Sequence, residues 1–101
     1  MRITSSVLSN EKSSDWELFL TLVDDKALKA KGIQLIPLVV KSKNDIYKIP
    51  SARARYEASV YGAKCFPIVT VDGSIVARRR LLKASEYESL IDGLSLQWRN
   101  E

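Results

Sequence analysis

The stretch YGAKCFPIVTVDGS, residues 61–74, carries the signals that decide the fold of this chain. Gly62 favours the end of a helix, and Pro67 precedes four β-favouring residues, 68–71. The Asp-Gly pair that follows is a hairpin turn signal, which predicts a return strand over 74–78. The stretch therefore predicts a helix end, a loop and an antiparallel hairpin, in that order.

The residues before this stretch predict a strand, a helix and a second strand. Residues 3–8 alternate weakly and are rich in β-branched side chains, which favours a short strand. A capping-box pattern, Ser14 to Glu17, begins a helix over 14–31, in which apolar residues recur every three or four positions. Residues 33–40 are almost continuously apolar and predict a strand, and Pro37 places that strand at an edge or at an irregularity.

The remaining segments complete one α/β domain. After a charged connection, 41–49, Pro50 and Ser51 begin a second helix, and a capping-box pattern at 85–88 begins a last one. The order is β-α-β-α-β-β-α, which predicts a four-stranded mixed sheet flanked by helices on both faces. We expect a single domain over residues 1–94. A C-terminal tail follows at 95–101, whose apolar residues either pack back on the domain or contact a partner.

Composition excludes many kinds of catalytic site. The chain has 101 residues, one cysteine and no histidine, so it has no internal disulfide, no Ser-His-Asp triad, no Cys-His pair and no imidazole or four-thiolate zinc site. We accordingly expect no metal and no cofactor. A lone thiol is typical of a reducing compartment, which makes the cytoplasm the expected location. No apolar run approaches the roughly 18 residues of a membrane helix, so no membrane association is expected.

Positive charge is concentrated in the middle of the chain. Residues 41–83 hold ten basic and three acidic groups, whereas residues 1–40 hold five of each. This excess would attract an anionic partner such as a nucleic acid. Successive strand residues face opposite sides, so the run of arginines at 78–80 does not predict a single three-armed clamp. Arg53 and Arg55 diverge by about 200° around a helix, and the tyrosines nearby match no nucleic-acid signature.

The element order, with a proline directly before the third strand, resembles the thioredoxin-like fold. Residues 61–74 carry the resemblance, and it continues through 78–80 into the helix near Ser85. Within that superfamily the chain is similar to glutaredoxin-like domains and to the arsenical-resistance repressor and metallochaperone group. The resemblance implies that Pro67 is a cis-proline and that its loop faces the region where relatives have their active site.

The chain departs from the family at its reactive position. Active members hold a cysteine between the first strand and the first helix, where the helix N-terminus lowers the thiol pKa. Residues 9–15, SNEKSSD, contain none. A hydroxyl does not replace a thiolate in disulfide exchange, and the arsenic-binding group also uses several cysteines here. We therefore expect neither thiol oxidoreduction at this site nor arsenite chelation, and interpret Ser13 and Ser14 first as helix-start residues.

Two further features lie in the Pro67 loop. Cys65, the sole thiol, is two residues before the proline, and it is either a lone redox, metal or mixed-disulfide residue or a small buried hydrophobe. Phe66 and Pro67 occupy the position where relatives pair their backbone with an extended peptide or glutathione. That surface can bind a peptide without thiol chemistry.

We therefore predict a redox-inactive thioredoxin-like domain that binds a protein or peptide, or acts as a scaffold, rather than an enzyme. The candidate binding residues are Ser13, Ser14, Phe66, Pro67, Arg78 and Arg80. Two alternatives stay open: a single-thiol redox or thiol-binding protein that uses Cys65, and a basic module, built on 41–83, that binds nucleic acid or another anion. A homodimer is a further option, because residues 3–8 or 75–78 would present a strand edge.

Overall fold

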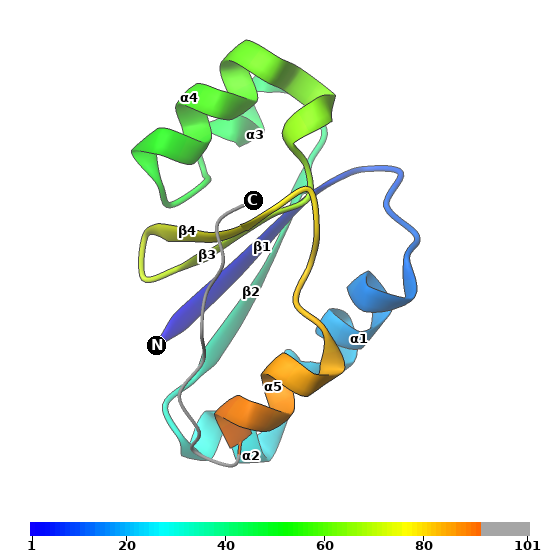
Figure 1. The fold of residues 1–101 in the computed structure, drawn as a ribbon, viewed down its shortest axis with the longest axis vertical. Coiled ribbons are helices and arrows are strands. Elements are labelled where there is room, and N and C mark those ends of the chain that lie inside the picture. Colours follow the sequence, from blue (N-terminus) through cyan, green and yellow to red (C-terminus); the bar gives the residue numbers. More distant parts are fainter. Residues whose placement is uncertain (92–101) are drawn as a thin grey trace.

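Four strands form one mixed sheet in the computed structural model, which describes residues 1–91. The strands are β1 (Arg2–Leu8), β2 (Gln34–Val40), β3 (Ile68–Val71) and β4 (Ser74–Arg78). Their order across the sheet is β2-β1-β3-β4 (Figure 1). β1 runs parallel to β2 and antiparallel to β3, and β3 runs antiparallel to β4. The predicted four-stranded mixed sheet is confirmed.

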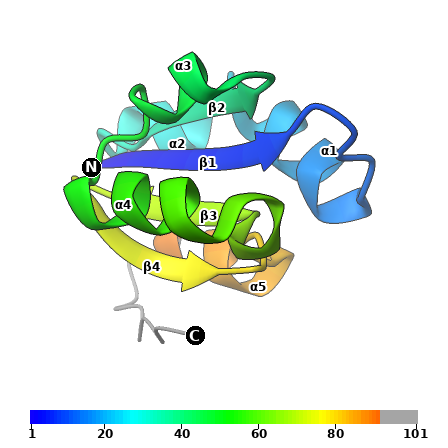
Figure 2. The same cartoon turned by 90° about the horizontal axis from the view of Figure 1, so that it is seen from above.

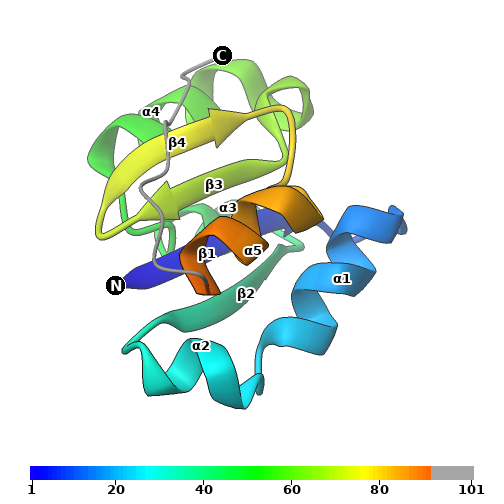
Figure 3. The same cartoon turned by 60° about the horizontal axis from the view of Figure 1, so that its bottom comes forward.

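Helices cover both faces of this sheet, as predicted. The helices α1 (Ser14–Leu22), α2 (Lys26–Ala30) and α5 (Ala84–Ile91) lie on one face. The helices α3 (Lys43–Ile46) and α4 (Ala52–Tyr61), with the 3₁₀ turn η1 (Gly62–Cys65), lie on the other. Figures 2 and 3 show the two helical layers with the sheet between them.

Each helical layer has its own apolar cluster. Beneath α1, α2 and α5 the buried side chains include Ile3, Phe19 and Val69. Beneath α4 they include Ala54 and Ala58, with Ile49, Cys65 and Ile68. The small alanine side chains bring the α4 backbone close to the sheet, which places the outward-facing residues of α4 beside the edge strand β4.

The helix predicted over 14–31 is wrong as a single element, because the chain forms α1 and α2 with a break between them. Asp25 begins the second helix: its Oδ1 atom accepts a hydrogen bond from the amide of Leu28 at 3.0 Å. Asp24 and Asp25 both lie in the break between the two helices. An aspartate cap competes with helix continuation. α1 ends at Leu22, with Val23 at its C-cap, and Asp25 starts α2.

The cap of α1 is one residue earlier than predicted, and the cap position of α5 is two residues earlier. Ser13, not Ser14, caps α1, since its Oγ atom accepts a hydrogen bond from the amide of Trp16 at 3.2 Å. In α5 the Glu86 carboxylate accepts a hydrogen bond from the amide of Lys83 at 3.0 Å, so Glu88 is not the residue that reaches back. Serine-rich helix starts offer several equivalent registers, and the sequence pattern alone does not choose among them.

The connection at 41–49 contains α3, which was not predicted. The Asp45 carboxylate accepts hydrogen bonds from the amides of Lys41 at 2.8 Å and Ser42 at 3.2 Å. These contacts close one short turn of helix. The Lys41 amide and then the Lys48 ammonium hold the pKa of the Asp45 carboxyl below its usual value.

The sheet has β2 and β4 at its edges. Pro37 therefore lies on an edge strand, as predicted, where its missing amide proton costs no inner hydrogen bond. β1 is paired on both sides, so residues 3–8 offer no free edge for a dimer, whereas β4 does lie at an edge. None of the helices in the described residues is both long enough and apolar enough to cross a membrane. The predicted tail, 95–101, lies outside those residues.

Candidate functional site

Two pockets lie near the end of β4, and Arg79 contributes to both. The first, called here the Pro67 pocket, has a volume of about 310 Å³ and is lined by Glu11, Ser13, Asp15, Pro67, Arg79, Arg80, Leu81 and Lys83. The second, called the α4 pocket, has a volume of about 430 Å³ and is lined by Arg53, Glu57, Tyr61, Lys64, Cys65, Arg78 and Arg79. They form the candidate site.

Three connections build the Pro67 pocket: the loop between β1 and α1, the residues before β3, and the link from β4 to α5. The first supplies Ser13, the second Pro67, and the third Arg79, Arg80, Leu81 and Lys83. Ser13 and Pro67, which are more than fifty positions apart in the sequence, thus line the same cavity. Ser14, the other candidate at this position, is an exposed residue of α1 and is not a lining residue.

The hydroxyl of Ser13 has a structural role. It accepts from the Trp16 amide at the start of α1, and its Oγ atom lies 3.4 Å from Glu11 Oε1, to which it donates. A serine that caps a helix typically contributes about 1 kcal/mol to its stability. The interpretation of Ser13 as a helix-start residue is confirmed, and the hydroxyl also forms part of the pocket wall.

The Pro67 pocket has charges of opposite sign on its walls. Glu11 and Asp15 come from the first loop and helix, whereas residues 79, 80 and 83 supply two arginines and a lysine. Arg80 is engaged: its Nη1 atom donates to Glu86 Oε1 at 2.9 Å, and both side chains are about one-quarter exposed or less. Arg80 thus connects the pocket wall to α5.

Phe66 and Pro67 are placed differently although they are adjacent. The Phe66 side chain is half-buried against the apolar cluster beneath α4, whereas Pro67 lines the pocket on the opposite side. The peptide bond between them is cis, the isomer that the resemblance implied. The paired part of β3 starts at Ile68, so residues 66 and 67 lie at the end of the sheet, beside the cavity.

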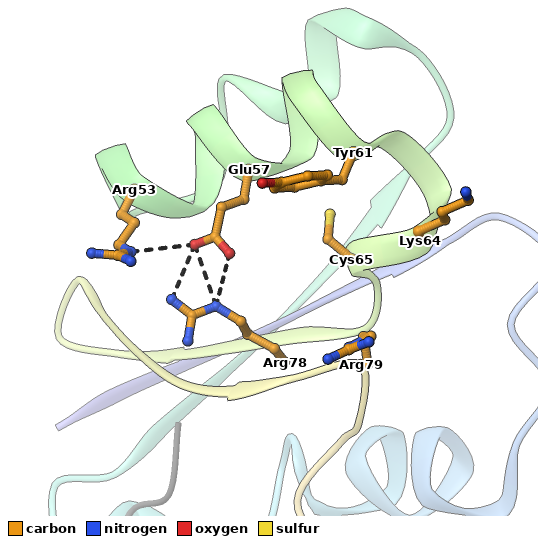
Figure 4. Close-up of a pocket in the computed structure, with 7 residues that line it drawn as sticks. All are labelled: Arg53, Glu57, Tyr61, Lys64, Cys65, Arg78 and Arg79. Carbon is orange, nitrogen blue, oxygen red and sulfur yellow. Dashed lines mark hydrogen bonds and ion pairs between the residues drawn. The ribbon is translucent and has the colours of Figure 1, made fainter. Parts of the chain in front are cut away.

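The α4 pocket contains an ion-pair network that sequence reasoning missed. Glu57 accepts hydrogen bonds from Arg78 Nε at 2.9 Å and from Arg78 Nη2 at 3.0 Å. Both side chains are only 18% exposed. Arg53 Nε adds a longer contact of 3.5 Å to the same carboxylate (Figure 4). The spacing from Arg53 to Glu57 is a recognisable helical pair, but the partner on β4 is 21 residues away and gives no sequence signal.

Arg78 and Arg80 contact opposite layers of the molecule. Arg78 pairs with α4, and Arg80 pairs with α5. In a continued strand, two residues that are two positions apart would face the same side. β4 ends at Arg78, however, and Arg79 adopts a positive φ of 59°, which turns the backbone. The expectation that residues 78–80 do not form one clamp is confirmed, and the candidates Arg78 and Arg80 lie in different pockets.

Cys65 is buried, with 7% of its surface exposed. Its thiol donates to the carbonyl oxygen of Gly62 at 3.1 Å. Burial raises the pKa of the Cys65 thiol, and the charge on Glu57 raises it further. A higher pKa leaves less thiolate at neutral pH, which is the opposite of what a reactive cysteine needs.

The two arginines of α4 contact different partners. Arg53 contacts Glu57, whereas Arg55 Nη1 donates to the carbonyl oxygen of Ile49 at 2.6 Å. The predicted divergence of the two arginines is confirmed. Tyr61 is 59% exposed, and its ring forms a wall of the α4 pocket.

Comparisons of the chain with protein-family models, with curated proteins and with solved structures gave no match. The site is therefore interpreted from its own geometry and chemistry.

Proposed function

We propose that this chain is a redox-inactive, thioredoxin-like domain whose Pro67 pocket binds an extended peptide segment of a partner protein. The sheet supports the fold assignment: the order β2-β1-β3-β4 has one parallel pair followed by two antiparallel pairs. The proline before β3 and the Asp-Gly hairpin after it are where the resemblance expects them.

One observation carries the functional part of the proposal: Ser13 and Pro67 line the same cavity. In thioredoxin-like proteins the start of the first helix supplies the reactive thiolate and the proline loop supplies the peptide-binding surface. Here the first position holds a serine whose hydroxyl caps α1. The shared cavity supports a peptide site that has no nucleophilic sulfur.

The sole thiol does not restore the missing chemistry. Cys65 lines the α4 pocket rather than the Pro67 pocket, and burial raises its pKa. The proposed activity is binding alone.

The walls of the Pro67 pocket indicate the kind of peptide that it accepts. Glu11 and Asp15 line the cavity together with Arg79 and Lys83, so a segment with charges of both signs is complementary to it. Its backbone would run past residues 66 and 67, next to the first paired residue of β3.

Selection of peptides from a displayed random library, followed by calorimetry, tests the proposal. Lys83→Glu reverses a charge on the pocket wall and should weaken a selected peptide about tenfold, which is about 1.4 kcal/mol. Lys26→Glu, on exposed α2, is the matched control and should leave affinity unchanged. Equal affinity for wild type and Lys83→Glu would argue against the Pro67 pocket as the peptide site.

Reduction of insulin by dithiothreitol tests the redox part separately. The protein should not accelerate the reaction, since no thiol lines the Pro67 pocket. An acceleration that disappears in Cys65→Ser would show that the protein is an enzyme after all.

A further inference from the structure

The α4 pocket has a strong excess of positive charge. Four basic side chains line it, from Arg53, Lys64, Arg78 and Arg79, against a single carboxylate, from Glu57. A cavity with a net charge of about +3 and partly buried walls favours an anion more than an open basic surface does, because solvent screens the charges less.

Glu57 fixes the position of the basic wall. Its carboxylate binds the Nε and Nη2 atoms of Arg78 and also contacts Arg53 (Figure 4). Both guanidinium groups are thereby held near one carboxylate. A ligand that binds a preorganised arginine loses less side-chain entropy than one that must order it.

Arg79 is the pocket cation best placed to contact a ligand directly. Its side chain is exposed, and within residues 1–91 it forms no ion pair. Figure 4 shows its guanidinium on the side of the pocket where Arg78 lies, whereas the Lys64 ammonium points away from the other labelled side chains. The positive φ of Arg79, 59°, is an unfavourable conformation for arginine that the neighbouring structure maintains.

Tyr61 gives the pocket an aromatic wall. Its ring is 59% exposed and lies over the Cys65 side chain in Figure 4. An exposed ring beside a group of cations suits a ligand that joins a planar ring to an anion, because the ring stacks while the anion binds the guanidinium groups.

We propose that the α4 pocket binds a small molecule that combines a planar ring with a phosphate monoester. The phosphate contacts Arg79 and the arginines held by Glu57, and the ring stacks on Tyr61. A phosphate monoester carries about −1.5 to −2 charges at neutral pH, opposite in sign to the net charge of the pocket lining. The volume of about 430 Å³ is within the range of small-molecule sites. This binding goes beyond the proposed peptide binding and occupies a different cavity.

Calorimetry on the full chain at low ionic strength tests the proposal with four probes: adenosine monophosphate, phosphotyrosine, ribose 5-phosphate and inorganic phosphate. The two probes with a planar ring should bind about 2–10-fold more tightly than the two without one, which is the usual contribution of an aromatic contact. A preference between adenosine monophosphate and phosphotyrosine identifies a nucleotide or an aryl phosphate as the source of the ring.

Two variants locate the binding. Tyr61→Ala should remove the advantage of the ring-bearing probes and leave inorganic phosphate unaffected. Arg79→Asn should weaken all four probes about tenfold, since it removes one charge-assisted contact, and asparagine tolerates a positive φ. Lys26→Ala, on α2, is the matched charge control and should change nothing. Circular dichroism of each variant verifies that it is folded.

Several results would overturn the proposal: no binding of any probe at low salt, equal affinity with and without a ring, or equal losses in Lys26→Ala and Arg79→Asn. Tyr61 lines the α4 pocket and not the Pro67 pocket, so Tyr61→Ala should still bind the selected peptide. Loss of phosphate binding with intact peptide binding in that variant therefore tests this site apart from the proposed function.

Discussion

Glu57→Gln should destabilise the protein more than any exposed charge change on α4. The substitution keeps the shape of the side chain and removes its charge. In the wild type the Glu57 carboxylate accepts two hydrogen bonds from Arg78, at 2.9 and 3.0 Å. The side chains of Glu57 and Arg78 are each 18% exposed. The amide retains one oxygen acceptor but places an NH₂ group opposite the guanidinium, so one hydrogen bond and the charge attraction are lost.

The expected cost follows from the burial of Arg78. A hydrogen bond to a charged group contributes about 1.5–3 kcal/mol, and a partly buried cation that loses its partner also loses the compensation for its desolvation. We expect Glu57→Gln to lower the free energy of unfolding by about 2 kcal/mol. Arg53→Ala removes a contact of 3.5 Å from a side chain that is 78% exposed, and should cost about 0–0.5 kcal/mol.

Urea unfolding followed by circular dichroism measures both changes. The midpoint should fall clearly for Glu57→Gln and hardly at all for Arg53→Ala, with the slope m unchanged in both. Equal midpoints for the two variants would refute the conclusion that Glu57 and Arg78 form the main electrostatic link between α4 and β4.

Three further predictions test local features of the structure. Ser13→Ala removes the cap of α1 and should lower the free energy of unfolding in urea by about 1 kcal/mol. Ser14→Ala should lower it by less, and the reverse order would assign the cap to Ser14. Tyr87→Phe should be neutral or stabilising, because the buried Tyr87 hydroxyl has no hydrogen-bond partner within residues 1–91 and its burial raises its pKa; a clear loss of thermal stability would contradict this. Alkylation of Cys65 should stay slow through pH 8.5, where a free thiol is half ionised, and accelerate only at higher pH because its pKa is raised; half-maximal reaction below pH 8 would contradict the buried, protonated thiol.

Most of the sheet was predictable because its signals are local. The Asp-Gly turn sets both central residues at positive φ, 50° for Asp72 and 87° for Gly73, which closes the hairpin. Pro37 indicated an edge strand before any partner was known. The break at Asp25 was missed because the apolar stripe of 14–31 continues across it. Periodicity does not reveal when an aspartate caps a new helix instead of facing solvent.

The candidate site was predictable only in part. Ser13 and Pro67 line the same pocket, which the resemblance to the thioredoxin-like fold implied. The pairing of Arg78 with Glu57 was not predictable, since it depends on how closely α4 packs on the sheet through its two buried alanines. The separation of Arg78 from Arg80 depends on the positive φ at residue 79, and arginine gives no sequence signal for that conformation.

Photo-crosslinking of a selected peptide to the protein tests the central claim most directly. A benzophenone placed along the peptide should cross-link to the residues that line the Pro67 pocket and not to the exposed side of α4 or to β2. The lining residues are Glu11, Ser13, Asp15, Pro67, Arg79, Arg80, Leu81 and Lys83. Cross-links found only on α4 or β2 would contradict the proposal that the Pro67 pocket is the binding site. A peptide that binds tightly but forms no cross-link to the pocket residues would contradict it as well.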